Sequence, residues 1–152
     1  MRSGAIRGLS VGKTDASAAV LITAIGDADD EVRYLALVAC GERRIAGCAD
    51  AAVRALRDAD QGVRVAAIAA LAAIHAVNHR AHVRPLLADA DQGVRYGAII
   101  ALSRLGDDEI DGIIVAVATL DPPLRAQLAG HEQALALDDR QRTLWRELTR
   151  AP

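Results

Sequence analysis

Apolar residues along the middle of the chain recur at spacings of three and four positions. The clearest run comprises Val63, Ala66, Ala67, Ala70, Leu71 and Ile74. A second run comprises Val94, Ala98, Ile99, Leu102 and Leu105. Each run predicts a helix with one apolar face, because side chains three and four residues apart lie on the same side of a helix. Gly106 and Asp107 follow the second run and predict a turn.

The apolar runs belong to a longer pattern that repeats along the chain without gaps. Its copies begin at Asp27, Asp58 and Asp89, which are equally spaced, and each contains a Val-Arg pair. A fourth, degraded copy begins at Asp121. The spacing between copies accommodates two short helices and two turns, so the sequence predicts an all-α chain of stacked helix pairs.

Each predicted pair has a first helix, called helix A, and a second, called helix B. Residues that precede the A helices and are expected to cap them are Asp29, Asp60 and Asp91. A carboxylate at that position accepts the free amide protons of the first turn. The predicted core positions of the B helices are Val53 and Leu56, then Val83, Leu86 and Leu87, then Ile114, Val117 and Leu120.

These elements divide one predicted domain, residues 1–152, into repeat units. A partial repeat at 4–26, with a reduced A helix at 4–10, precedes full repeats at 27–57, 58–88 and 89–120. The degenerate unit 121–150 ends in a polar-faced helix that carries Leu144, Trp145 and Leu148. We expect that helix to cap the stack, because the last apolar face of a repeat array must be covered.

The composition favours helices and argues against a nucleic-acid partner. Aromatic residues make up only 2% of the chain, so its apolar content is mostly Ala, Leu, Ile and Val. Small side chains of this kind suit closely stacked helices better than sheets. The net charge of −2 lacks the basic excess on which nucleic-acid affinity normally depends.

The repeated pattern DxDxxVRxxAxxAL resembles the HEAT-repeat family, particularly the short repeats of phycobilin-lyase subunits, over residues 14–137. The resemblance implies a right-handed α–α superhelix, a HEAT-like solenoid of about four helix-pair repeats. It also implies that the B helices line the concave face. HEAT-like repeats serve many functions, so the resemblance alone implies none of them.

One arginine recurs in each repeat, at Arg33, Arg64, Arg95 and Arg125. These arginines could bind an anionic ligand, or they could tie neighbouring repeats together. The turn aspartates that recur in step with them are Asp27, Asp58 and Asp89. The HEAT resemblance implies the second role, so we interpret both sets as structural residues between repeats.

The sequence predicts no catalytic residue, no metal and no cofactor. The histidine cluster of His75, His79 and His82 straddles a predicted turn. It has no Asp, Glu or Cys within the segment to complete a metal-ligand set. The pair His131-Glu132 is similar to the His-Glu pairs of deoxyhypusine hydroxylase, a HEAT-like di-iron enzyme, but lies out of register with the repeats.

The sequence also predicts neither a HEAT-like DNA glycosylase nor a nucleotide-binding protein. HEAT-like DNA glycosylases use aromatic residues in a basic channel, whereas the central B helices here contain no aromatic residue on which a base could stack. The run Gly12-Lys13-Thr14 lacks the first glycine and the preceding strand of a phosphate-binding loop.

The outward positions of the predicted B helices form a strip of small, apolar and basic residues. Those on which we expect a partner to bind are Arg54, Arg57, His82, Pro85, Ile113 and Ala116. Ile113 lies in a segment, GIIVAVATL, that is apolar on nearly all sides and therefore needs a cover. The cover could be a partner, a second chain or the C-terminal helix. If the helix register is off by one, these side chains are partly buried instead.

We interpret the chain as a non-enzymatic interaction module or scaffold that binds an amphipathic or acidic segment of another protein. The alternatives are an accessory subunit of a lyase-type enzyme and a nucleic-acid-binding solenoid, of which the charge disfavours the second. The oligomeric state stays open.

The expected location is the cytoplasm, without membrane attachment. The first residues lack the apolar run of a signal peptide, and the longest apolar stretch, Val65 to Ile74, is too short to span a bilayer. Cys40 and Cys48 match no metal-ligand spacing, so we expect two reduced thiols.

Overall fold

The computed structural model describes residues 15–150, and every regular element in that range is helical. The α-helices are α2 (Asp15–Ala24), α3 (Asp30–Glu42), α4 (Ala49–Ala55), α5 (Gln61–Ala73), α6 (Arg80–Val83), α7 (Gln92–Arg104), α8 (Ile110–Leu120), α9 (Pro122–Ala129) and α10 (Asp139–Arg150). Short 3-10 helices are η1 (Ala46–Cys48), η2 (Val77–His79), η3 (Arg84–Ala88) and η4 (Glu132–Ala134). The predicted helix at 4–10 and the Gly12-Lys13-Thr14 run lie outside the described residues.

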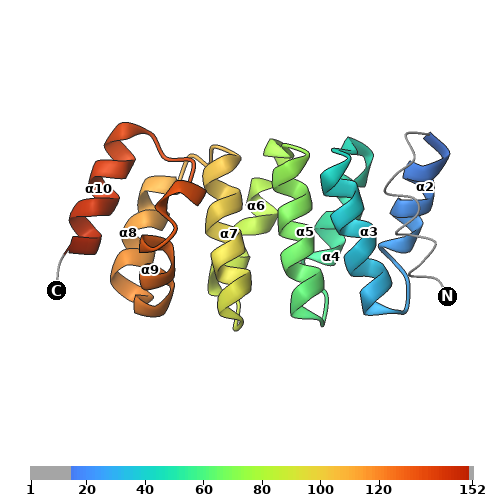
Figure 1. The fold of residues 1–152 in the computed structure, drawn as a ribbon, viewed down its shortest axis with the longest axis horizontal. Helices are drawn as coiled ribbons and strands as arrows, with labels where there is room; N and C mark the ends of the chain where they lie inside the picture. The colour runs from blue at the N-terminus through green and yellow to red at the C-terminus, as the bar shows by residue number, and fades with distance from the viewer. Residues whose placement is uncertain (1–14, 151–152) are drawn as a thin grey trace.

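The helices form two rows that run the length of the molecule (Figure 1). The A helices α3, α5 and α7 lie side by side in one row, and α4, α6 and α8 lie in a second row behind them. Helices α2 and α10 stand at opposite ends. The principal contacts join each A helix to the next along the stack. This arrangement confirms the predicted α-solenoid.

Each A helix begins at an aspartate that caps it. Asp29 accepts hydrogen bonds from the backbone amides of Glu31 and Val32. In the next two repeats Asp60 and Asp91 accept the amide protons of residues three positions ahead. The predicted capping role is confirmed, and the caps fix where each A helix starts.

Each central A helix also ends in the same way. Arg44, His75 and Gly106 occupy equivalent positions of successive repeats and adopt left-handed backbone conformations, with φ values of 52°, 57° and 65°. The residue that follows each of them donates its amide proton back to a carbonyl five positions earlier, as in the pair Ile45–Cys40. This helix-ending motif reverses the chain toward helix B.

The core lies between the two rows and is built from equivalent positions of successive repeats. Leu37, Ile68 and Ile99 are all almost fully buried. At Gly41 an added Cβ would lie 3.2 Å from the Cα of Ala70, so α3 and α5 approach each other closely at this point. At the C-terminal end Trp145 of α10 is buried, and Gln141 donates to Asp111 at 2.9 Å, which holds α10 beside α8.

The second B helix is interrupted. Helix α6 has only four residues and continues as the 3-10 helix η3, with Pro85 near the start of η3. Proline lacks an amide proton and its ring disfavours a continuous α-helix, so the chain changes its hydrogen-bonding pattern here. This irregular segment separates the two grooves described below.

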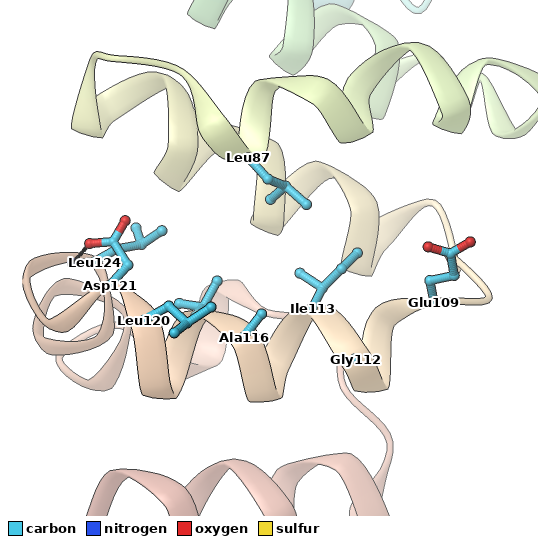
Figure 2. A pocket seen from close by; sticks show the side chains of 9 residues that line it. Leu87, Glu109, Gly112, Ile113, Ala116, Leu120, Asp121 and Leu124 are labelled. Atoms are coloured by element: carbon cyan, nitrogen blue, oxygen red, sulfur yellow. Dashed lines mark hydrogen bonds between the residues drawn. The ribbon is translucent and has the colours of Figure 1, made fainter.

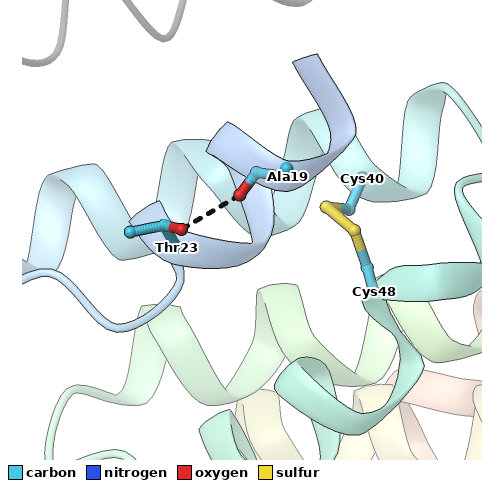
Figure 3. The surroundings of a disulfide bond; sticks show 4 residues. All are labelled: Ala19, Thr23, Cys40 and Cys48. Carbon is cyan, nitrogen blue, oxygen red and sulfur yellow. Dashed lines mark hydrogen bonds between the residues drawn. A yellow bond between two sulfur atoms is a disulfide. The ribbon is translucent and has the colours of Figure 1, made fainter. Parts of the chain in front are cut away.

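The cysteines correct one expectation from the sequence. Cys40 and Cys48 form a disulfide that joins the end of α3 to η1 (Figure 3), so the expectation of two reduced thiols is wrong. The pairing was missed because the spacing of two cysteines does not show that a turn folds one onto the other. Disulfides occur mainly in oxidising compartments, so the cysteines no longer support a cytoplasmic location. Among the described helices, none has the length and apolar character needed to cross a membrane.

Candidate partner-binding face

Arginine–aspartate pairs link the turns of successive repeats. Arg33 donates from Nε and Nη2 to both carboxylate oxygens of Asp58, at 2.7 and 2.8 Å. Arg64 binds Asp89 in the same way, at 3.0 and 2.9 Å. Each arginine also donates from Nη1 to two carbonyls of its own turn. One guanidinium therefore holds two adjacent repeats in register.

The arginines and aspartates toward the two ends of the series have different partners. Arg95 donates from Nε to Asp121 at 2.8 Å, which extends the series to α9. Arg125 donates to the carbonyl of Ala118 at 3.3 Å and has no carboxylate partner within residues 15–150. Asp27, at the other end, accepts the amide proton of Asp29 on its side chain, and its carbonyl accepts from Arg33. Arg33, Arg64 and Arg95 already hold carboxylates, which leaves little of them for an anionic ligand.

Electrostatics support the ionised form of the first two pairs. The hydrogen bond with Asp58 raises the pKa of Arg33, and the same bond lowers the pKa of Asp58 against the opposing effect of burial. Burial disfavours the ionised form of Asp89, but the hydrogen bonds from Arg64 and from the Asp91 amide outweigh it and lower the pKa of Asp89.

A further anchor was not predicted from the sequence. Arg84, at the start of η3, donates to both carboxylate oxygens of Asp107 at 3.0 Å, and also to Asp108 and Glu109. Arg80 donates to the carbonyl of Gly106. The acidic run at 107–109 could have indicated this anchor in the sequence, because the equivalent turn of the preceding repeat, at 76–78, has no acidic residue. These bonds fix the irregular segment α6–η3 against the next turn.

The basic groove lies between α4 and the α6–η3 segment. It has a volume of about 500 Å³, and the predicted binding residues Arg54, Arg57, His82 and Pro85 all line it. All four side chains are exposed. Within residues 15–150, neither Arg54 nor Arg57 has a carboxylate partner, so their charges face solvent uncompensated.

The apolar groove lies on the other side of η3, between η3 and α8, and has a volume of about 580 Å³. Figure 2 shows Leu87 pointing from η3 toward Ile113, with Ala116 and Leu120 farther along α8. Glu109 and Asp121 lie near opposite ends of α8. Arg84 binds the first carboxylate and Arg95 the second, so the negative charge at both ends is largely compensated.

The structure corrects the predicted register of α8. Ile113, expected to point outward, is only 8% exposed, whereas Leu120, expected in the core, is 81% exposed. The buried side of α8 consists of Ile110, Ile113, Ile114, Val117 and Ala118. Ala116 is exposed, as expected of an outward position. Ile113 still lines the apolar groove, but as part of its floor.

The C-terminal helix does not cover the apolar groove. In Figure 2 the groove opens between η3 and α8, while the C-terminal helix lies on the opposite side of α8. Asp111 accepts hydrogen bonds from Gln141 and Arg140, which lower its pKa and hold α10 on that side. Of the three covers considered for α8, the C-terminal helix thus packs against the side away from the groove.

The four histidines lie in turns or in short helices. His75 occupies the left-handed turn at the end of α5. The rings of His79 and His82 lie 5.8 Å apart. Glu132 accepts hydrogen bonds from Arg146, and His131 Nδ1 lies 3.0 Å from the carbonyl of Gln127. Among the described residues, no group of three or more His, Cys, Asp or Glu side chains is placed to hold a metal ion.

The family profile described as HEAT repeats matches residues 16–102 and 49–136. The chain is similar to the structure of the complex of CpcE and CpcF of phycocyanin lyase from Nostoc sp. PCC7120, with 18% sequence identity and a TM-score of 0.62. That alignment covers 97% of this chain and 72% of the other. A comparison with curated proteins gives no match.

Proposed function

The chain belongs to the family of HEAT repeats, and from that premise we propose that it is a non-enzymatic interaction module that binds a partner protein on its B-helix face. The observation that carries the proposal is the pair of adjoining grooves on either side of η3. Leu120, 81% exposed, continues the apolar lining of that groove into solvent, and contiguous apolar surface of this kind marks an interaction site.

The two grooves differ in chemistry, which defines the partner segment. The apolar groove has compensated charges at its ends, so it favours apolar side chains. Arg54 and Arg57 in the basic groove have no such compensation and favour carboxylates. The segment that fits both grooves is amphipathic and crosses η3. Its apolar residues lie over α8 and its acidic residues lie over α4.

A second candidate is an accessory subunit of a lyase-type enzyme. The likeness to the CpcE–CpcF complex of phycocyanin lyase supports it, because that complex joins two chains. In this case the partner is a companion subunit, and the B-helix face is the contact between subunits. Identification of the bound partner distinguishes this candidate from a scaffold that binds an unrelated protein.

The test uses exposed residues, because Ile113 is too buried for a clean probe. An arginine at that position would place a charge in the core and could unfold the protein. A partner captured by cross-linking from the native organism is titrated with Leu120→Arg, with Arg54→Glu and with the unsubstituted chain. Tyr34→Arg, at an exposed apolar residue of α3, is the matched control.

We expect Leu120→Arg to weaken binding by about 1–3 kcal/mol if Leu120 is a central contact. Arg54→Glu should mainly slow association, because a rim charge steers an acidic partner. Tyr34→Arg should bind as the unsubstituted protein does. Full binding by a folded Leu120→Arg variant would contradict the proposal and direct attention to the A-helix face.

A further inference from the structure

The outward side of α5 is apolar, although it faces away from the core. Residues 65–74 contain no polar side chain. Ala69 and Ala73, one helical turn apart, are exposed, and Val65 and Ala72 are half-buried. A surface helix normally carries polar or charged residues on its solvent-facing side. The proposed partner site lies on the B helices, so it does not explain why this side of α5 is apolar.

The A-face groove lies beside this surface, between α5 and α7. It has a volume of about 700 Å³ and is lined mostly by small and apolar side chains. Gly97 of α7 keeps it open: an added Cβ there would meet only the side chain of Ile68, at 3.8 Å. A smaller groove between α3 and α5 shares Ala69 and Ala73, so these alanines form a low ridge with a groove on each side.

The charged residues that line the A-face groove are Arg44 and Arg104, and His75 lies between them in the series. Arg44 and His75 follow the ends of α3 and α5, and Arg104 ends α7; all three are exposed. Within residues 15–150, no carboxylate pairs with Arg44 or Arg104, in contrast to Arg33 and Arg64. Glu42 is the acidic residue that lines the smaller groove. One end of the A-face groove is thus a concentration of positive charge beside an apolar floor.

The walls of the groove determine what kind of segment fits. Helices α5 and α7 satisfy their backbone groups internally, so they offer side chains rather than amides and carbonyls to a ligand. An extended peptide would leave its own backbone groups unpaired against this apolar floor, whereas a helix pairs them internally. Small residues let the backbone of such a helix approach closely. From Gly93 to Arg104 the groove follows α7 for about 17 Å, or three helical turns.

We infer that the A-face groove binds an amphipathic helix of a partner protein, about three turns long, with carboxylates at one end. Its small apolar side lies against Ala69, Ala73 and Gly97, and its carboxylates pair with Arg44 and Arg104. This surface lies on the A-helix row, whereas the proposed partner site lies on the B-helix row, so the chain can hold two segments at once.

The test uses two labelled synthetic helices and the full chain. Both peptides have about 15 residues with an Ala-Leu stripe; one carries two glutamates in its last turn and the other carries two lysines there. Binding is followed by fluorescence anisotropy. We expect the glutamate peptide to bind more tightly than the lysine peptide, by about tenfold or more. The double variant Arg44→Glu/Arg104→Glu should reverse this preference.

Two further variants complete the design. Gly97→Leu should fill the groove and abolish binding of the glutamate peptide, while circular dichroism shows the same helicity and cooperative melting. The proposed B-helix site also favours acidic amphipathic segments, so every variant is measured in an Arg54→Glu/Arg57→Glu background as well. That background should keep binding at the A-face groove, which separates this inference from the proposed function. Absence of glutamate-peptide binding, an unchanged preference in the reversed variant, or full binding by folded Gly97→Leu would overturn the inference.

Discussion

At the level of single residues, the Arg–Asp pairs between repeats differ from ordinary surface ion pairs. Isolated exposed pairs contribute little to stability, because solvent screens them and both side chains lose freedom. The Arg64 and Asp89 side chains are only 15% and 11% exposed. Arg64 also donates to two backbone carbonyls, so its geometry is fixed from both sides. Bidentate charge-assisted bonds of this kind are stronger than single neutral ones.

We expect Arg64→Ala to lower the free energy of unfolding by about 1–3 kcal/mol, because it leaves the Asp89 carboxylate without its arginine. Urea denaturation followed by circular dichroism measures the change. Arg54→Ala is the matched control: this exposed arginine has no ion pair among the described residues, so its loss should change stability by less than about 0.5 kcal/mol. Equal midpoints for the two variants would contradict a structural role for Arg64.

The recurrence of arginine and aspartate could be predicted from the sequence, but the direction of pairing could not. The regular spacing of the repeats shows that the two residue types recur in step. It does not show whether Arg33 binds the aspartate of its own turn or that of the next, which depends on the distance between stacked helices. The structure uses both: the side chain of Asp58 and the backbone carbonyl of Asp27 accept from Arg33.

At the level of the elements, the A helices were easier to predict than the B helices. Each A helix has an aspartate cap, regularly spaced core residues and a defined turn at its end. Helix α8 is apolar on nearly all sides, so periodicity alone cannot choose which side is buried, and Ile113 and Leu120 were placed incorrectly. In the short α6–η3 segment the predicted core residues Val83 and Leu86 are buried, but the interruption of the helix around Pro85, where the chain is 3-10 helical, was not predicted.

The ends of the A helices give a prediction about backbone strain. His75 and Gly106 occupy equivalent positions in the turns after α5 and α7, with φ values of 57° and 65°. Left-handed backbone costs a side-chain-bearing residue about 1–2 kcal/mol, whereas glycine adopts it freely. His75→Gly should therefore stabilise the protein by about 0.5–1 kcal/mol, after the greater freedom of glycine in the unfolded chain is subtracted.

The reciprocal change is the control for this prediction. Gly106→Ala should destabilise the protein, although nothing lies within 4 Å of the added Cβ, because only the backbone conformation is unfavourable. The urea denaturation midpoints of both variants, compared with that of the parent chain, measure these two changes in stability. A destabilised His75→Gly variant would show that the imidazole makes a contact that outweighs the strain.

At the scale of the whole molecule, the inter-repeat pairs act as a series along one edge of the solenoid. Each repeat contacts mainly its neighbours, so stability depends on the interfaces between repeats as well as on the repeats themselves. The pairs at Arg33, Arg64 and Arg95 connect four consecutive turns. Weakening the carboxylates of this series together should therefore affect the entire stack rather than one helix pair.

Low pH weakens these carboxylates together, and the lowered pKa values of the aspartates determine whether it raises or lowers the stability. The pKa values of Asp58 and Asp89 are lowered in the folded chain, while an unfolded aspartate titrates with a pKa of about 3.9. Their stabilising contribution is therefore complete above the unfolded pKa and is lost as the pH falls through the lower folded values. We expect the free energy of unfolding to change little between about pH 7 and pH 5 and to fall steeply below about pH 4.

The double variant Arg33→Gln/Arg64→Gln tests whether the inter-repeat pairs cause this acid sensitivity. Without the guanidinium groups, the two aspartates should titrate nearer to their ordinary pKa, so protonation removes less stability. The variant should be less stable than the parent at neutral pH, and the difference should shrink as the pH falls below about 4. Urea midpoints measured at several pH values give both curves. Parallel curves over the whole range would assign the acid sensitivity to other carboxylates, such as the helix caps Asp29, Asp60 and Asp91.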